Sequence, residues 1–122
     1  MARVVAFVPD LMFGSRVVSA LSASGHEPVL AMDADAARSQ LPGAELLIVD
    51  LTDDTAARIE EARQLRSGDL RLLGFYSHVE ADVRDRAEQA GFDLVVPRSR
   101  MAREGGGLVT RLLGAGGSAV PD

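Results

Sequence analysis

The chain has 122 residues, of which 47% are hydrophobic and only 4% are aromatic, so we expect one domain with a core of aliphatic side chains. It contains no Cys, which excludes disulfides, thiolate metal ligands and cysteine nucleophiles and fits a reducing compartment. The net charge of -5 argues against a nucleic-acid partner, and no apolar run approaches the ~18 residues of a membrane helix. We therefore expect a cytoplasmic protein that binds neither nucleic acid nor a membrane.

The strongest pattern in the chain is the apolar run that ends in Asp50. Residues 46–49 are Leu, Leu, Ile and Val, and such an uninterrupted run predicts a strand buried on both faces of a parallel sheet. Four further apolar runs predict the other strands. In chain order, the expected strands are Arg3–Val8, Pro28–Met32, Leu46–Asp50, Leu70–Tyr76 and Phe92–Val96.

The segments between these strands have apolar residues at helical spacing. Gly25, Gly68 and Gly91 each follow such a segment, and glycine is typical of the left-handed residue that ends a helix. The expected helices are Phe13–Ser24, a short helix capped by Asp33 or Asp35 and running to Leu41, Thr55–Arg66, Glu80–Ala90 and Gly107–Leu113.

The last helix is the most difficult to place because residues 105–107 are all glycine. Each glycine in a helix interior costs about 1 kcal/mol relative to alanine, so we start this helix near Gly107 and end it at Leu113. The folded domain then spans residues 1–113. Residues 114–122 form a Gly-rich tail that we expect to be disordered.

Regular alternation of strands and helices predicts an α/β fold with a parallel sheet covered on both faces. The strand order 2-1-3-4-5, which is the flavodoxin-like (βα)5 three-layer sandwich, places a crevice between strands 1 and 3. Asp10 and Asp50 follow these two strands, so we expect both carboxylates at the crevice.

From Arg3 to about Leu113 the chain resembles the receiver domains of bacterial response regulators. The segments that carry the resemblance are RVVAFVPD, LLIVDLTD and RAEQAGFDLVVPR, together with the lengths of the elements between them. In that family an aspartate ending the third strand is phosphorylated, and Asp50 matches it. The resemblance implies a non-enzymatic module of two-component signalling.

The chain departs from the receiver pattern at the residues around this aspartate. The acidic pair that holds Mg²⁺ in the family aligns with Val8 and Pro9, and Asp10 matches only the next position. Tyr76 stands where the family has Thr or Ser, and Ser77 follows one place later. These departures affect the metal site and the residues that respond to phosphorylation.

The segment after the fifth strand also differs. Val95 stands where the family has an aromatic residue, Arg98 replaces a lysine, and Pro97 lies one place earlier than the family's proline. A guanidinium can form a bidentate salt bridge with a carboxylate, so Arg98 could pair with Asp50 and hold the site in one state without phosphate. We interpret the chain as a degenerate, pseudo-receiver-like domain.

Phosphoryl transfer needs a divalent cation to neutralise the charge that develops on the phosphoryl oxygens. The residues that differ from the family pattern include those that would bind this cation. We therefore expect a stand-alone interaction module that needs no cofactor and is not efficiently phosphorylated. It would act on an unidentified protein partner or as a homodimer through its last helices and strand. The first alternative is a working phosphoacceptor, in which Asp50 and Asp10 weakly hold Mg²⁺ with the Thr52 carbonyl.

The second alternative is a small-molecule or anion binder at the carboxyl edge of the sheet. Leu11, Met12 and Phe13 would form an apolar lip for a ligand or partner, and Arg98 with Arg100 would hold an anion. The competing interpretation is that the apolar residues fold back onto the core and the arginines pair with nearby acids.

Simpler roles also exist for the remaining candidates. His78 could sense pH or bind a metal at the same edge, or simply form a local hydrogen bond. Asp10 could cap the following helix. Asp50 could pair with Arg98 or accept hydrogen bonds from the amides of residues 53 and 55.

Overall fold

The computed structural model describes residues 2–77 and 81–118 of the chain. In these residues five strands alternate with five helices along the chain. The strands are β1 (Arg3–Phe7), β2 (Glu27–Ala31), β3 (Leu46–Asp50), β4 (Arg71–Tyr76) and β5 (Leu94–Pro97). The helices are α1 (Leu11–Ala23), α2 (Ala34–Gln40), α3 (Thr55–Leu65), α4 (Ala81–Gln89) and α5 (Arg98–Ser118).

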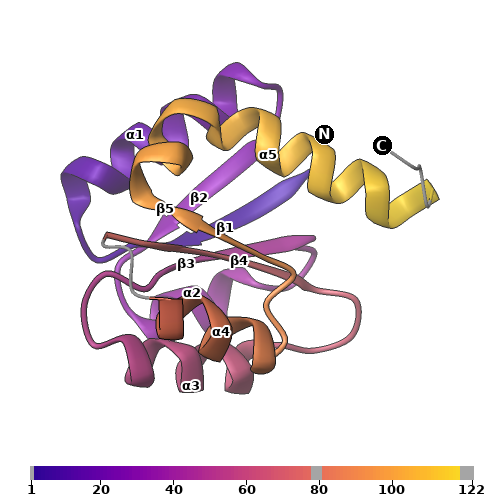
Figure 1. The fold of residues 1–122 in the computed structure, drawn as a ribbon. Helices are drawn as coiled ribbons and strands as arrows, with labels where there is room; N and C mark the ends of the chain where they lie inside the picture. The colour runs from indigo at the N-terminus through magenta and orange to yellow at the C-terminus, as the bar shows by residue number, and fades with distance from the viewer. Residues whose placement is uncertain (1, 78–80, 119–122) are drawn as a thin grey trace.

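The strands form one sheet in the order β2-β1-β3-β4-β5, and every neighbouring pair is parallel. Helices α1 and α5 cover one face, and α2, α3 and α4 cover the other (Figure 1). The predicted flavodoxin-like (βα)5 fold and its strand order are confirmed. The central position of β3 follows from its composition, because all five of its residues are buried.

The sheet separates two hydrophobic cores, as the alternation of side chains along each strand requires. Val5, Leu47 and Val49 point to the α2–α3–α4 side, where they meet helical residues such as Ile59 and Ala62. On the other side, alternate residues of the same strands pack against α1 and α5 in a second core formed by Val4, Ala6, Ile48, Phe75, Phe13, Val17, Leu21, Met101, Leu108 and Val109. Burial of each large aliphatic side chain contributes about 1.5–3 kcal/mol to folding.

Helix boundaries follow the signals in the sequence for α1 to α3. Asp10 caps α1, because its side chain accepts a hydrogen bond from the Phe13 amide at 3.1 Å. Asp33 caps α2 in the same way through the Ala36 amide, at 2.7 Å. Gly25 has φ +86°, as the left-handed end of α1 requires. The predicted start of α4 at residue 80 lies outside the described residues.

The prediction for the last helix is wrong. Helix α5 starts at Arg98 rather than Gly107, and it continues to Ser118 rather than ending at Leu113. Part of the segment expected to be a disordered tail, residues 114–118, therefore lies in the helix, and residues 119–122 lie outside the described part of the chain.

Close packing of α5 against α1 explains the glycine at position 106 of this helix. A Cβ on Gly106 would meet the Ser24 side chain and would lie only 2.9 Å from the Ala20 carbonyl oxygen. Glycine at this position lets the two helices approach, and burial of Met101, Leu108 and Val109 offsets the cost in helix propensity.

No helix in the described residues is both long enough and apolar enough to cross a membrane.

The adjacent glycines of α5 provide a matched test of this packing. We expect Gly106→Ala to lower the free energy of unfolding by about 1–3 kcal/mol, because the backbone oxygen of Ala20 cannot move away as a flexible side chain would. A Cβ on Gly107 would meet no atom within 4 Å, so Gly107→Ala should raise the free energy of unfolding by about 1 kcal/mol. Urea or thermal unfolding of both variants measures the difference, and equal effects of the two substitutions would contradict it.

Candidate functional site at the carboxyl edge

A cavity of about 330 Å³ lies at the carboxyl edge of the sheet, beyond the ends of β1 and β3. The predicted residues Asp10, Asp50 and Arg98 all line it. The other lining residues are Pro9, Thr52, Asp53, Asp54 and Arg58. The carboxylates expected at the crevice between strands 1 and 3 are therefore brought to one cavity.

Asp50 is the last residue of β3 and is only 6% exposed. Its Oδ1 atom accepts a hydrogen bond from the Thr52 amide at 2.8 Å and another from the Thr52 hydroxyl. This local turn replaces the expected bonds to Arg98 or to the amides of residues 53 and 55. The Thr52 amide is only two residues ahead of Asp50 in the chain. This hydrogen bond therefore forms within the loop after β3 and requires no contact with another element.

Asp10 uses both of its carboxylate oxygens. Oδ1 accepts the Phe13 amide hydrogen bond that caps α1, and Oδ2 accepts a hydrogen bond from Arg98 Nη2 at 3.3 Å. The helix-cap interpretation of Asp10 is therefore correct. The ion pair itself is worth about 0.2–1 kcal/mol, because the side chains of Asp10 and Arg98 are 48% and 41% exposed.

Arg98 lies over an aromatic ring as well. Its guanidinium carbon is 4.2 Å from the centre of the Phe13 ring, and Phe13 packs against Phe75 with ring centres 5.0 Å apart. The predicted salt bridge between Arg98 and Asp50 is wrong. Arg98 is the first residue of α5, and stacking on Phe13 directs it to Asp10 at the start of α1 instead.

The apolar lip divides into one buried residue and two exposed ones. Phe13 is 5% exposed and belongs to the core, so its assignment to the lip is wrong. Leu11 and Met12 are 59% and 82% exposed in the first turn of α1. His78 lies outside the described residues, so nothing in the structure bears on its predicted role.

Arg100 does not line the cavity in the described structure. It lies in the first turn of α5, where its Nε is 3.5 Å from Glu104 Oε1. A hydrogen bond from Arg103, together with the nearby charge of Arg100, lowers the pKa of Glu104 below its ordinary value. Arg100 is thus paired on the helix surface, as the competing interpretation of the arginines expected.

The two positions at the end of β4 lie apart from the cavity lining. Tyr76 is buried in the core on the α2–α3–α4 side and is in register with Pro97 of β5. Ser77 is exposed. Their roles as equivalents of the family's switch residue stay predictions.

Arg58 is a site residue that the sequence patterns did not indicate. Helical periodicity places it on the solvent face of α3, but the first turn of this helix lies beside the cavity. Its guanidinium lies 5.1 Å from the centre of the Phe7 ring and forms an ion pair with Glu61 at 2.9 Å. Position in the first turn after a strand-end loop is the signal that would have suggested it.

The residues present do not fit the Mg²⁺ site of the resembled family. Val8 is fully buried and apolar, and Pro9 has no side-chain oxygen, so neither supplies a ligand. Both oxygens of Asp10 and one oxygen of Asp50 already accept hydrogen bonds. Among the described residues, no group of three or more His, Cys, Asp and Glu side chains is placed to hold a metal ion.

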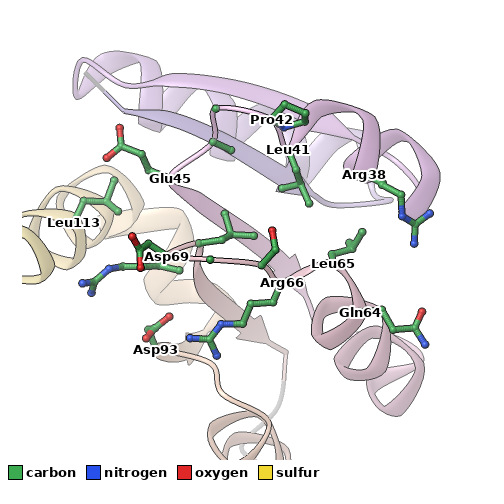
Figure 2. A pocket seen from close by; sticks show the side chains of 16 residues that line it. Arg38, Leu41, Pro42, Glu45, Gln64, Leu65, Arg66, Asp69, Asp93 and Leu113 are labelled. Atoms are coloured by element: carbon green, nitrogen blue, oxygen red, sulfur yellow. The ribbon is translucent and has the colours of Figure 1, made fainter.

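A larger cavity of about 1050 Å³ opens at the opposite, amino-terminal edge of the sheet (Figure 2). Three arginines and three acidic residues line it. Arg66 donates to the Gly91 carbonyl at 2.8 Å, and Asp93 accepts from the Leu72 amide at 2.9 Å. These two bonds join the segment after α3 to the segment after α4, and β4 to the segment before β5, so Arg66 and Asp93 serve the packing of the domain.

No family model and no curated protein matches the chain. Its structure, however, is similar to solved structures. A response regulator from Thermotoga maritima has a TM-score of 0.83 at 16% identity, with 93% of this chain and 98% of that chain covered. The protein has the fold of a receiver domain. A receiver domain protein from Clostridium thermocellum gives 0.82 at 10% identity, with coverage of 98% and 100%.

A third receiver protein, from Burkholderia phymatum, has a TM-score of 0.78 at 22% identity and covers 93% of this chain and 96% of its own. The resemblance to receiver domains is thus confirmed at the level of the fold. Identities this low carry no information on the chemistry of the site. The function of the carboxyl edge therefore depends on the residues of this chain.

Arg98 and Arg100 offer a paired test of the contacts between α5 and α1. We expect Arg98→Ala to lower the free energy of unfolding by about 1–2 kcal/mol, because it removes the ion pair and the contact with the Phe13 ring. Arg100→Ala is the control and should change it by less than about 0.5 kcal/mol.

A double-mutant cycle of Arg98→Ala with Asp10→Asn isolates the ion pair, since asparagine keeps the helix cap. We expect a coupling of about 0.2–1 kcal/mol in thermal unfolding. Equal losses for Arg98→Ala and Arg100→Ala, or no coupling in the cycle, would show that Arg98 does not hold the two helix starts together.

Proposed function

We propose that the protein is a receiver-fold signalling module that works through protein contacts and is not efficiently phosphorylated at Asp50. In this proposal it is not an enzyme, needs no resident metal and acts in the cytoplasm. The partner's identity is open, and self-association through the last helices, α4 and α5, and the last strand, β5, stays a prediction.

The observation that carries the proposal is that both carboxylate oxygens of Asp10 already accept hydrogen bonds. Among the acidic residues of the cavity it lies nearest in sequence to the positions of the family's metal ligands, yet one oxygen caps α1 and the other holds Arg98. A metal ion at this position would have to compete with both contacts. Without a divalent cation, the charge that develops on a transferred phosphoryl group has no partner of sufficient strength.

Arg98 does not hold Asp50, so the salt bridge that would have fixed the site without phosphate is no part of the proposal. Arg98 lies over Phe13 and pairs with Asp10 instead. The Asp50 carboxylate accepts two bonds from Thr52, which hold it in its present orientation. The proposal therefore depends on the contacts of Asp10 and on the absence of ligand oxygens in the side chains of residues 8 and 9.

The anion-binding alternative receives less support from the geometry. Arg98 and Arg100 are each paired with a carboxylate, and the cavity is lined by twice as many aspartates as arginines. The Mg²⁺-dependent phosphoacceptor remains the alternative that the experiment must separate from the proposal.

Thermal unfolding with and without Mg²⁺ and beryllofluoride tests the proposal, because beryllofluoride mimics a phosphorylated aspartate. A ligand present at a hundred times its dissociation constant adds ~2.7 kcal/mol, which corresponds to a shift of several degrees for a domain of this size. We expect no shift at millimolar Mg²⁺, since the side chains of residues 8 and 9 supply no ligand oxygen and both oxygens of Asp10 already accept hydrogen bonds.

The control is the Asp50→Asn variant, which keeps an oxygen to accept the Thr52 bonds. A shift in the original protein that disappears in Asp50→Asn would overturn the proposal and establish a phosphorylation switch. A receiver domain known to bind beryllofluoride, treated in parallel, shows that the reagent was active.

A further inference from the structure

The charges around the carboxyl-edge cavity are not balanced. Four aspartates and two arginines line it. Both arginines already have carboxylate partners, since Arg98 pairs with Asp10 and Arg58 pairs with Glu61. Asp50, Asp53 and Asp54 have no basic partner among the described residues, so the cavity has an unmatched negative charge.

The Asp50 carboxylate contributes to this imbalance. Asp50 is 6% exposed, and only its Oδ1 atom accepts hydrogen bonds from the described residues. Its Oδ2 atom has no hydrogen-bond or ion-pair partner in the part of the chain that the structure describes, and it is open to the cavity rather than buried. A cationic group that enters the cavity would therefore find one free carboxylate oxygen of Asp50.

Large apolar side chains are exposed beside the same cavity. Leu11 and Met12 follow directly after the lining residue Asp10, and they are 59% and 82% exposed. Neither residue contributes to the described cores. Exposed apolar groups next to unmatched charge are typical of surfaces that bind another protein.

We propose that this edge binds a partner protein through an arginine or lysine side chain that enters the cavity, while apolar residues beside it pack on Leu11 and Met12. The inference rests on the proposed function, because a module that works through protein contacts needs such a surface. A guanidinium binds a carboxylate through two parallel hydrogen bonds, and such bonds are strong when water is excluded. A cavity of about 330 Å³ has room for one such group.

The chemistry of the cavity distinguishes this occupant from the others. An anion would face three aspartates without basic partners among the described residues, and electrostatic repulsion would oppose its entry. A divalent metal ion would need several oxygen ligands in fixed geometry, which the described residues do not provide. A long basic side chain is attracted by the aspartates and needs no fixed set of oxygen ligands, because the partner surface holds its position.

Selection from a random-peptide library displayed on phage, with the immobilised protein in metal-free buffer, tests the proposal. We expect the selected peptides to combine Arg or Lys with neighbouring apolar residues. The strongest binder is then synthesised with its basic residue intact and with that residue replaced by uncharged citrulline or glutamine. The neutral peptide should bind at least about tenfold more weakly, and the affinity of the basic peptide should fall as salt is added.

Variants of the protein locate the binding surface. Asp53→Asn with Asp54→Asn should weaken binding of the basic peptide by about tenfold or more, and Met12→Ser should also weaken it. Asparagine suits position 54, because residue 54 has φ +48° and asparagine tolerates the left-handed conformation. The control is Asp69→Asn, which removes an exposed carboxylate at the opposite edge and should leave binding unchanged. Thermal unfolding confirms that each variant is folded.

Several results would overturn this inference. They are selection of peptides without basic residues, failure to select any peptide, equal binding of the neutral peptide, and equal loss of binding in Asp69→Asn. The selection uses neither Mg²⁺ nor a phosphate donor, so its outcome is independent of the beryllofluoride measurement. A phosphorylated Asp50 with a basic-peptide site would overturn only the proposed function, and an inert Asp50 without such a site would overturn only this inference.

Discussion

Burial of β3 on both faces is the constraint on which the rest of the structure depends. Its four aliphatic residues are fully buried between two layers of helices, so the strand lies inside the sheet rather than at its edge. The parallel direction of the strands then carries Asp50 to the carboxyl edge. There the end of β1 brings Asp10 to the same cavity, and the crevice of the flavodoxin-like order forms between them.

The start of α1 forms two contacts at this edge, both through Asp10. Asp10 stabilises the helix through one oxygen and holds Arg98 through the other, so two helix starts from opposite ends of the chain are connected by one carboxylate. The ring of Phe13 lies beneath the guanidinium and packs on Phe75 of β4. Our proposal that Asp50 is not efficiently phosphorylated depends on this double use of Asp10.

Farther along α5, a different contact joins this helix to α1. Gly106 lies against Ala20 and Ser24, and this close approach sets how α5 crosses α1. His26 extends the contact, because its Nε2 atom is 2.9 Å from the Thr110 hydroxyl of α5. Helix α5 therefore contacts α1 and the following turn near its middle, and it contacts Asp10 through Arg98 at its start.

Local patterns in the sequence determined the strands and the caps of α1 and α2, because these features depend on residues that are neighbours in the chain, such as the aliphatic run of β3 or the glycine after α1. The strand order, and with it the arrival of Asp10 and Asp50 at one edge, followed instead from the general rules for parallel α/β sheets. Only the tertiary structure decided where α5 begins, that Phe13 is buried, and that Arg98 pairs with Asp10 rather than Asp50. The Arg98 contact joins residues 88 positions apart, and only the approach of α1 explains a glycine at position 106 of α5. Contacts of this kind depend on how whole elements pack, and no short stretch of sequence contains that information.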